Sequence, residues 1–140
     1  MTSQGNDLLS RVEGLRASVA RMLQGRIDAV RDFLLVVSSL MPPSTDFGIE
    51  IGRRGKQVYY VDFKGVSVVM LSEDEYLPYL SSKEVRLTID KLPEDVLKQA
   101  RQDFKRILRE LMDSIMEYSK RHKEYYRVAD AVSEVVLQHL

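Results

Sequence analysis

A basic hairpin tip is the first feature of this sequence that could do chemistry. The stretch IGRRGKQVYY, residues 51–60, places two arginines between two glycines, with a lysine behind them. Because glycines supply the backbone conformations of a tight connection, we predict a hairpin turn over Gly52 to Gly55. Side chains at such a tip point into solvent, where they could touch a phosphate backbone. The candidate contacts are Arg53, Arg54 and Lys56.

A row of cations in a predicted C-terminal helix is the second such feature. Its members recur every three or four residues and fall within about 80° of one another on an ideal helix. They are Lys98, Arg101, Lys105 and Arg109. The row could bind nucleic acid or an acidic protein partner. It could equally be a solvated face held by ion pairs between residues four apart.

Residue patterns of catalysis are not found in this sequence. It has no cysteine, which excludes disulfides, thiolate metal sites and cysteine nucleophiles. The two histidines, His122 and His139, lie beside no serine or carboxylate pattern of a triad and have no paired-histidine metal spacing. We therefore predict no enzyme, no cofactor and no small-molecule substrate. An enzyme whose carboxylates are distant in sequence is the remaining catalytic alternative.

Composition and charge are those of a globular chain. Hydrophobic residues make up 44% of the 140 residues, charged residues make up 30%, and 21 basic residues balance 21 acidic ones. We predict a single domain over 1–140 with a buried core. Bulk charge gives no attraction to nucleic acid or to an anionic membrane, so any such contact depends on local placement. The single asparagine and the absence of cysteine suit a thermophile protein, and an excess of arginine over lysine is found in some thermophile families.

The apolar runs indicate no membrane association. The most apolar run, residues 33–41, is shorter than the roughly 20 residues that a membrane-spanning helix needs. No apolar stretch follows a basic start in the first residues, as it would in a signal peptide. A cytoplasmic location is therefore expected.

The elements that position these residues begin with a long helix. Apolar residues recur at steps of three and four over 8–22 and again over 23–41, with an offset of one residue near Gly25. This pattern predicts one amphipathic helix over 7–41, about 50 Å long, whose apolar seam shifts phase at Gly25. Two prolines end it.

Four extended segments over 47–90 predict an antiparallel meander. Its clearest turn signal is Asp62-Phe63-Lys64-Gly65, with aspartate first and glycine last. The two outer strands are amphipathic, whereas the two middle strands carry apolar residues on both faces. Such a sheet needs cover on both sides, from helices or from another molecule. A short helical turn is predicted from Ser72 in the link before the fourth strand.

The C-terminal segment is helical. Residues 93–140 contain no glycine, and their only proline is the first residue, where a helix tolerates it. They predict one helix of up to about 70 Å, or two helices broken near Ser119 to Lys123 if the protein is compact. The fold class is therefore α+β, with a long N-terminal amphipathic helix, a four-stranded antiparallel meander and a C-terminal helix or helix pair.

The order of these elements resembles that of the RWD and ubiquitin-conjugating folds. In those folds a proline-containing loop also separates the third and fourth strands, as Tyr76-Leu77-Pro78 does here. The resemblance implies a protein–protein interaction module. Conjugation through a thioester is excluded, because the chain has no cysteine.

The pattern as a whole predicts a non-catalytic protein–protein interaction or assembly module, as a homodimer or as a subunit of a larger complex. Its apolar seams have coiled-coil spacing and its sheet is apolar on both faces. The alternative is a nucleic-acid or ribonucleoprotein accessory factor that uses both basic features. The residues predicted for the oligomer interface are Leu15, Val19, Ile27, Val30, Leu34, Tyr118, Tyr125, Val132 and Val136.

Overall fold

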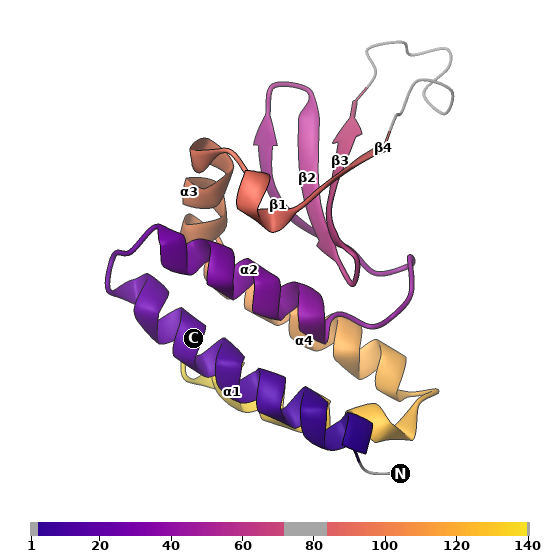
Figure 1. Ribbon diagram of the computed structural model, residues 1–140. Helices are drawn as coiled ribbons and strands as arrows, with labels where there is room; N and C mark the ends of the chain where they lie inside the picture. Colours follow the sequence, from indigo (N-terminus) through magenta and orange to yellow (C-terminus); the bar gives the residue numbers. More distant parts are fainter. Residues whose placement is uncertain (1–2, 72–83, 140) are drawn as a thin grey trace.

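A four-stranded antiparallel sheet lies on a layer of helices (Figure 1). The computed structural model describes residues 3–71 and 84–139. Within them, N-terminal helices precede the sheet and further helices follow it, so the predicted α+β class is confirmed. The helical turn predicted from Ser72 and the Tyr76-Leu77-Pro78 loop lie outside the described residues.

The N-terminal segment forms two helices, α1 (Ser3–Leu23) and α2 (Asp28–Leu40). Between them Gly25 has a φ of +93°, the left-handed conformation that commonly follows a helix C-terminus. Its N–H donates to the carbonyl of Met22 at 3.1 Å. The single helix predicted over 7–41 is therefore wrong. The offset at Gly25 marks the turn of a helical hairpin, whose two apolar seams pack together.

The sheet has the predicted meander order, β1 (Ile49–Arg54), β2 (Gln57–Asp62), β3 (Gly65–Met70) and β4 (Glu84–Leu87). The turn predicted from Asp62 to Gly65 is confirmed, because these two residues pair across the connection between β2 and β3. The fourth strand is shorter than predicted. It ends at Leu87, and the chain then forms the 3-10 turn η1 (Ile89–Lys91).

The first hairpin turn is displaced from its predicted position. Arg54 pairs with Gln57, so the tip consists of Gly55 and Lys56, and Gly52 belongs to the strand. The pairing register shifts between Glu50 and Gly52, where a β-bulge adds one residue to β1. The turn predicted over Gly52 to Gly55 is therefore wrong by about two residues, because the first glycine serves the strand and not the turn.

The C-terminal segment forms three helices, α3 (Glu94–Gln102), α4 (Phe104–Ser119) and α5 (Tyr126–Leu137), with the 3-10 turn η2 (Lys123–Tyr125) before the last. This agrees with the alternative in which the chain breaks near Ser119 to Lys123. A second break was not predicted. It lies at Asp103, whose φ of −98° and ψ of 14° turn the chain from α3, beside the sheet, into α4.

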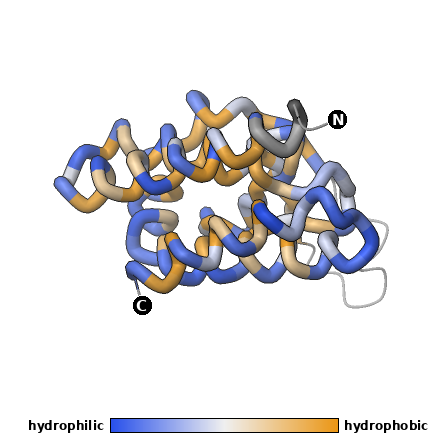
Figure 2. Tube along the Cα trace, turned by 90° about the horizontal axis from the view of Figure 1, so that it is seen from below, coloured by the Kyte–Doolittle hydropathy of each residue, from blue (hydrophilic) through white to orange (hydrophobic). Residues whose placement is uncertain are grey.

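Four helices close a ring below the sheet. α1 contacts α2 and α5, and α4 contacts α5 and α2. Hydrophobic and hydrophilic residues alternate along each of these helices (Figure 2), and the hydrophobic ones form one buried cluster with the inner face of the sheet. Burying a large apolar side chain contributes about 1.5–3 kcal/mol, so this cluster is the main stabilising feature. No helix in the described part of the chain is both long and apolar enough to cross a bilayer.

Candidate functional site

The β1 edge of the sheet is closed by side chains from two helices. The Gln99 amide of α3 accepts a hydrogen bond from the N–H of Arg53 at 2.9 Å and donates one to its carbonyl at 2.8 Å. Arg106 of α4 donates from Nη2 to the carbonyl of Glu50 at 2.7 Å. These bonds pair backbone groups that an edge strand otherwise offers to another chain.

Close packing of α3 on β1 makes this closure possible. A Cβ atom at Gly52 would lie 3.2 Å from both Val96 Cγ1 and Gln99 Oε1, so a larger residue would push the helix away. Arg106 is held by ion pairs with Glu110 and, at 3.4 Å, with Asp103. Partial burial lowers the pKa of Arg106, but the hydrogen bonds to these carboxylates outweigh burial and raise the pKa above its ordinary value.

The opposite edge, formed by β4, is open among the described residues. β4 pairs with β3 on one side, and no described strand or side chain pairs with the backbone of its other side. Val85 in its centre is 56% exposed. Met70 is 42% exposed and lies on the same face, because Val68, two residues before it, pairs with Val85. The open edge is therefore bordered by apolar side chains that water reaches.

A polar cluster on the outer face of the sheet holds β4 in place. The buried Asp62 carboxylate accepts a hydrogen bond from Arg86 Nη1 at 2.7 Å, and this bond raises the pKa of Arg86. Arg86 also lies 3.2 Å from Glu84, whose carboxylate accepts a hydrogen bond from Ser67 Oγ at 2.9 Å. The outer face is thus less apolar than its middle strands predicted. Where this polar cluster lies, the outer face of the sheet does not need a helix or another molecule to cover it.

The cations predicted at the hairpin tip are engaged within the chain. Arg53 pairs with Glu50 at 3.0 Å, and the hydrogen bond to this carboxylate raises the pKa of Arg53. Arg54 lies 3.4 Å from Asp95 in the first turn of α3. Lys56 is exposed at the tip itself. The hairpin is therefore next to the start of α3, and both of its arginines already have acidic partners.

The cations predicted on the C-terminal helices have no acidic partners among the described residues. They form what we call the α3–α4 row, which consists of Lys98, Arg101, Lys105 and Arg109. All four are exposed, and none makes a hydrogen bond or ion pair with another described residue. The bend at Asp103 divides the row into two pairs, one on each helix.

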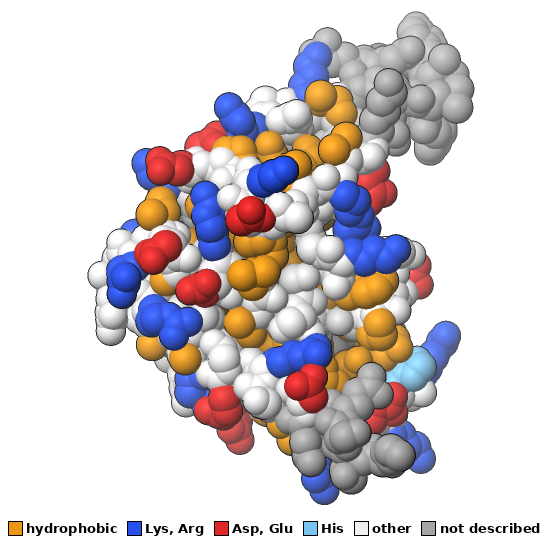
Figure 3. Space-filling model, viewed as in Figure 1, with side chains coloured by type: hydrophobic (Ala, Val, Ile, Leu, Met, Phe, Trp, Pro, Cys, Tyr) orange, Lys and Arg blue, Asp and Glu red, His pale blue; other side chains and the backbone are white. Residues whose placement is uncertain are grey.

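The face formed by α1 and α2 differs from the α3–α4 row, because its charged side chains form ion pairs. Its cations and carboxylates are interspersed (Figure 3). Arg21 lies 3.9 Å from Asp32, and Arg26 lies 3.7 Å from Asp28. Ion pairing there leaves little free charge, whereas the α3–α4 row keeps its charge unpaired.

The predicted oligomer interface falls mostly inside the chain. Its members Leu15, Val19, Val30, Leu34, Tyr125, Val132 and Val136 are all buried in the core cluster. Ile27 is 39% exposed at the α1–α2 connection, and Tyr118 packs edge-on against Tyr125 with ring centroids 4.9 Å apart. The apolar seams therefore fill the chain's own helical ring and are not offered to a second copy.

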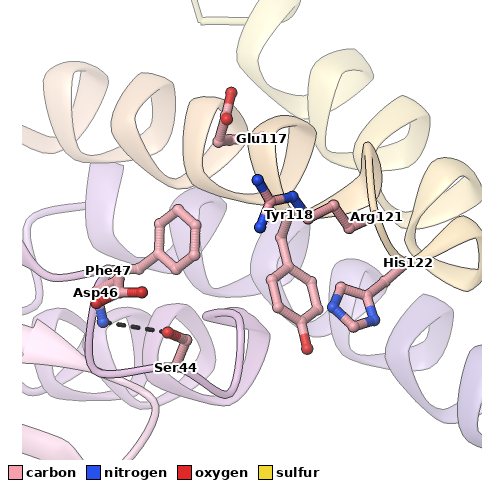
Figure 4. A pocket seen from close by; sticks show the side chains of 7 residues that line it. All are labelled: Ser44, Asp46, Phe47, Glu117, Tyr118, Arg121 and His122. Atoms are coloured by element: carbon pink, nitrogen blue, oxygen red, sulfur yellow. Dashed lines mark hydrogen bonds between the residues drawn. The ribbon is translucent and has the colours of Figure 1, made fainter.

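A hollow of about 280 Å³ lies beside the end of α4 (Figure 4). The His122 ring stacks on Tyr118, with centroids 4.0 Å apart and planes 13° apart. His122 Nδ1 lies 3.9 Å from the exposed Glu124 carboxylate. Ser44 Oγ accepts a hydrogen bond from the backbone N–H of Asp46, and no hydrogen bond joins His122 to a described nucleophile. Within the described residues no group of three or more acidic or histidine side chains could hold a metal ion. Among the described residues, the hollow therefore presents stacked rings and a histidine that lies near a carboxylate but is not hydrogen-bonded to it.

The buried Tyr125 phenol predicts a specific loss of stability at alkaline pH. Burial raises its pKa, and nearby Tyr118 and Glu124 add to this, while Arg11 opposes it. Because the folded pKa is raised, the stabilisation is complete below the unfolded value of about 10 and is lost as pH rises through the folded pKa. We expect the Tyr125→Phe variant to lose less stability than the wild type between neutral and strongly alkaline pH in denaturant titrations. Tyr126→Phe is the matched control, since that ring is 51% exposed, and it should follow the wild type. Equal alkaline losses in all three proteins would contradict the assignment.

The residues that close the β1 edge were missed by the sequence analysis. Gln99 lies 46 residues from Arg53, and Arg106 lies 56 residues from Glu50. The one local signal was Gly52, since a glycine within a strand often marks a close approach by another element.

Comparison of the chain with protein-family models, with curated proteins and with solved structures found no match. The resemblance to the RWD and ubiquitin-conjugating folds therefore rests on element order alone. The α1–α2 hairpin departs from the single leading helix on which that resemblance was based.

Proposed function

We propose that this chain is a non-catalytic protein–protein interaction module that pairs with a second copy of itself through β4. The asymmetry of the sheet supports this function. Gln99 and Arg106 close the β1 edge, whereas the β4 edge is open among the described residues and bordered by exposed apolar side chains. Strand addition at an open edge is a common mode of protein association, because main-chain hydrogen bonds supply affinity without a deep pocket.

The sequence of β4 is complementary to itself in an antiparallel pair. With a two-fold axis through Val85, Glu84 of each copy stands opposite Arg86 of the other, and the two Val85 side chains meet. Opposite-charge and β-branched pairs across strands each contribute about 0.2–1 kcal/mol. In this register Arg86, which already pairs with Asp62 and Glu84 of its own copy, also stands beside Glu84 of the partner, and the two-fold axis repeats this contact.

Oligomeric state measured over a wide range of protein concentration tests this proposal. Sedimentation velocity should show a monomer that becomes a dimer as concentration rises. Val85→Lys should weaken the dimer at least about tenfold, because like charges directly opposite each other in a strand pair are destabilising. Val85 is largely exposed, so this change should leave the fold intact.

Leu35→Lys is the matched control for this variant. Leu35 lies on α2 and is 53% exposed, so the same chemical change is made on a similarly exposed apolar residue away from the sheet. Its dimerisation should equal that of the wild type. A wild type that stays monomeric at the highest concentration would overturn the proposal, as would equal weakening by the two lysine variants.

A further inference from the structure

We infer that a second hollow, at one end of the helical layer, binds a small uncharged molecule whose carbonyl oxygen accepts a hydrogen bond from Tyr125. We call it the Tyr125 hollow. Its volume is about 450 Å³, within the range of about 300–1,000 Å³ that is usual for small-molecule sites. None of the described residues that border it belongs to β4. The inference therefore goes beyond the proposed pairing of two copies and does not depend on it.

Four segments that are distant in the sequence meet at the Tyr125 hollow. They are the start of α1 with Leu8 and Arg11, the end of α2 with Met41 behind it, the turn between β2 and β3 with Phe63, and η2 with Tyr125. The start of α1 and the end of α2 lie together at the right of the view in Figure 1. Leu8 and Met41 are buried in the core cluster, so these walls are already formed by the fold of the chain.

The phenol of Tyr125 is a nearly buried donor without a partner in the described part of the chain. The residue is only 6% exposed, and its ring packs edge-on against Tyr118. Its hydroxyl makes no hydrogen bond with a described residue. Among the described side chains, the only fully enclosed nitrogen or oxygen without a partner is Nε of Arg16. The Tyr125 oxygen is therefore not sealed off, and the hollow that Tyr125 borders gives a ligand access to it.

Arg11 provides further donors at the same hollow. Burial raises the pKa of Tyr125, and the charge of Arg11 opposes this shift, so the two side chains lie near each other. Arg11 donates to the carbonyl of Ser39 at 2.7 Å and to the carboxylate of Asp7 at 2.6 Å. A guanidinium has more N–H groups than these two bonds use, and it has no acceptor. Tyr125 and Arg11 thus both offer hydrogens, and a carbonyl oxygen with its lone pairs is the matching group.

The charges around the Tyr125 hollow are balanced, which favours an uncharged ligand. The carboxylate of Asp7 lies 2.6 Å from the guanidinium of Arg11 and largely offsets its charge. The C-terminal end of α2 also lies here, and the partial negative charge of a helix C-terminus disfavours an anion. An ammonium group brings only donors, which Tyr125 and Arg11 already supply. A neutral carbonyl avoids both conflicts.

The size and walls of the hollow define the rest of the ligand. A cavity of about 150 Å³ is enough to hold benzene, so the Tyr125 hollow has room for one aromatic ring with a short substituent. Leu8, Met41 and Phe63 supply apolar contacts for such a ring. The expected ligand class is therefore a small aromatic or alicyclic ketone, ester or amide, with its carbonyl directed at Tyr125.

An NMR titration with acetophenone tests the inference, with α-methylstyrene as the matched ligand. In α-methylstyrene a CH₂ group replaces the carbonyl oxygen, and the shape is otherwise kept. Acetophenone should shift the amide signals of residues around the hollow in a saturable way, with a dissociation constant on the order of 1 mM for so small a ligand. The inference would be overturned if no saturable shift occurred up to the solubility limit of the ketone, or if the shifts lay elsewhere.

Tyr125→Phe isolates the proposed hydrogen bond. For each protein, the affinity for acetophenone is divided by the affinity for α-methylstyrene, which removes the general difference in hydrophobicity between the ligands. This ratio should fall about five- to tenfold in Tyr125→Phe, the usual size of one hydrogen bond. Tyr126→Phe is the matched control, since Tyr126 is 51% exposed and does not border the hollow, and it should keep the ratio of the wild type. Equal ratios in the wild type and Tyr125→Phe would overturn the inference.

Phe63→Ala separates the apolar wall from the hydrogen bond. Phe63 is half-buried at the hollow, so its truncation should weaken both ligands by a similar factor and leave their ratio unchanged. Equal affinities in this variant and the wild type would place the ligands elsewhere and overturn the inference.

Charged analogues of similar size decide the class of ligand. Benzoate and benzylammonium should each bind more weakly than acetophenone, because the charges around the hollow are already balanced. Tighter binding of either ion would show that an unbalanced charge governs the site, and this would overturn the assignment of an uncharged ligand.

Discussion

Phe33→Ala is expected to lower the free energy of unfolding by about 3–5 kcal/mol, the usual cost of truncating a fully buried phenylalanine. Phe33 is 0% exposed in the middle of α2. This helix contacts α1 and α4 within the ring and also α3, η1 and β2. It therefore lies between the helical layer and the sheet, where atoms on all sides are held by other contacts and the cavity cannot easily collapse.

Equilibrium unfolding in urea or guanidinium measures this loss. Domains of this size are stable by about 5–15 kcal/mol, so the variant should unfold at much lower denaturant concentration. Leu35→Ala is the control, because Leu35 is on the same helix but 53% exposed. It should change stability by no more than about 0.5 kcal/mol. A similar cost at the two positions would contradict the central place of α2 in the core.

Arg106→Met is expected to cost about 2–3 kcal/mol, since hydrogen bonds to charged groups contribute about 1.5–3 kcal/mol. Methionine keeps most of the apolar stem but removes the guanidinium. The carbonyl of Glu50 then loses its donor, and the carboxylates of Asp103 and Glu110 lose their common partner. The side chain is about one-third exposed, so water replaces part of what is lost.

The control for this variant is Arg109→Met, three residues further along α4. Arg109 is exposed and has no ion pair with a described residue, so its replacement should leave stability within about 0.5 kcal/mol of the wild type. Denaturant titrations of the two variants side by side give the comparison. If Arg106→Met unfolded like Arg109→Met, the bond to the β1 backbone would carry no net stabilisation.

Local patterns were enough to predict the order of elements but not how the helices meet. A turn at Gly25 and a phase shift within one helix produce the same offset of apolar residues. The difference lies in the left-handed φ of Gly25 and in the packing of α2 on α1, which are properties of the folded chain. For the same reason, the apolar pattern could predict that Leu15 and Val132 are buried. It could not predict that both are buried within a single copy of the chain.

The candidate surfaces could also be predicted only in part, because they depend on contacts between residues far apart in the sequence. Spacing predicted that Lys98 and Arg109 share a helix face, and both are exposed. It could not say which cations have partners, because Arg54 meets Asp95 and Arg106 meets Glu50 only after the sheet and the helices come together. Charge pattern thus predicts exposure well, whereas free charge depends on tertiary structure.

The closed β1 edge has a consequence for how far assembly can proceed. A sheet with two open edges can add copies at both ends without limit, and such head-to-tail growth produces fibres. Here Gln99 and Arg106 occupy one end of the sheet. Pairing of two copies through β4 would use the other end of each. The product would be a finite eight-stranded sheet with a helical cap at both ends, and its stoichiometry would stop at two.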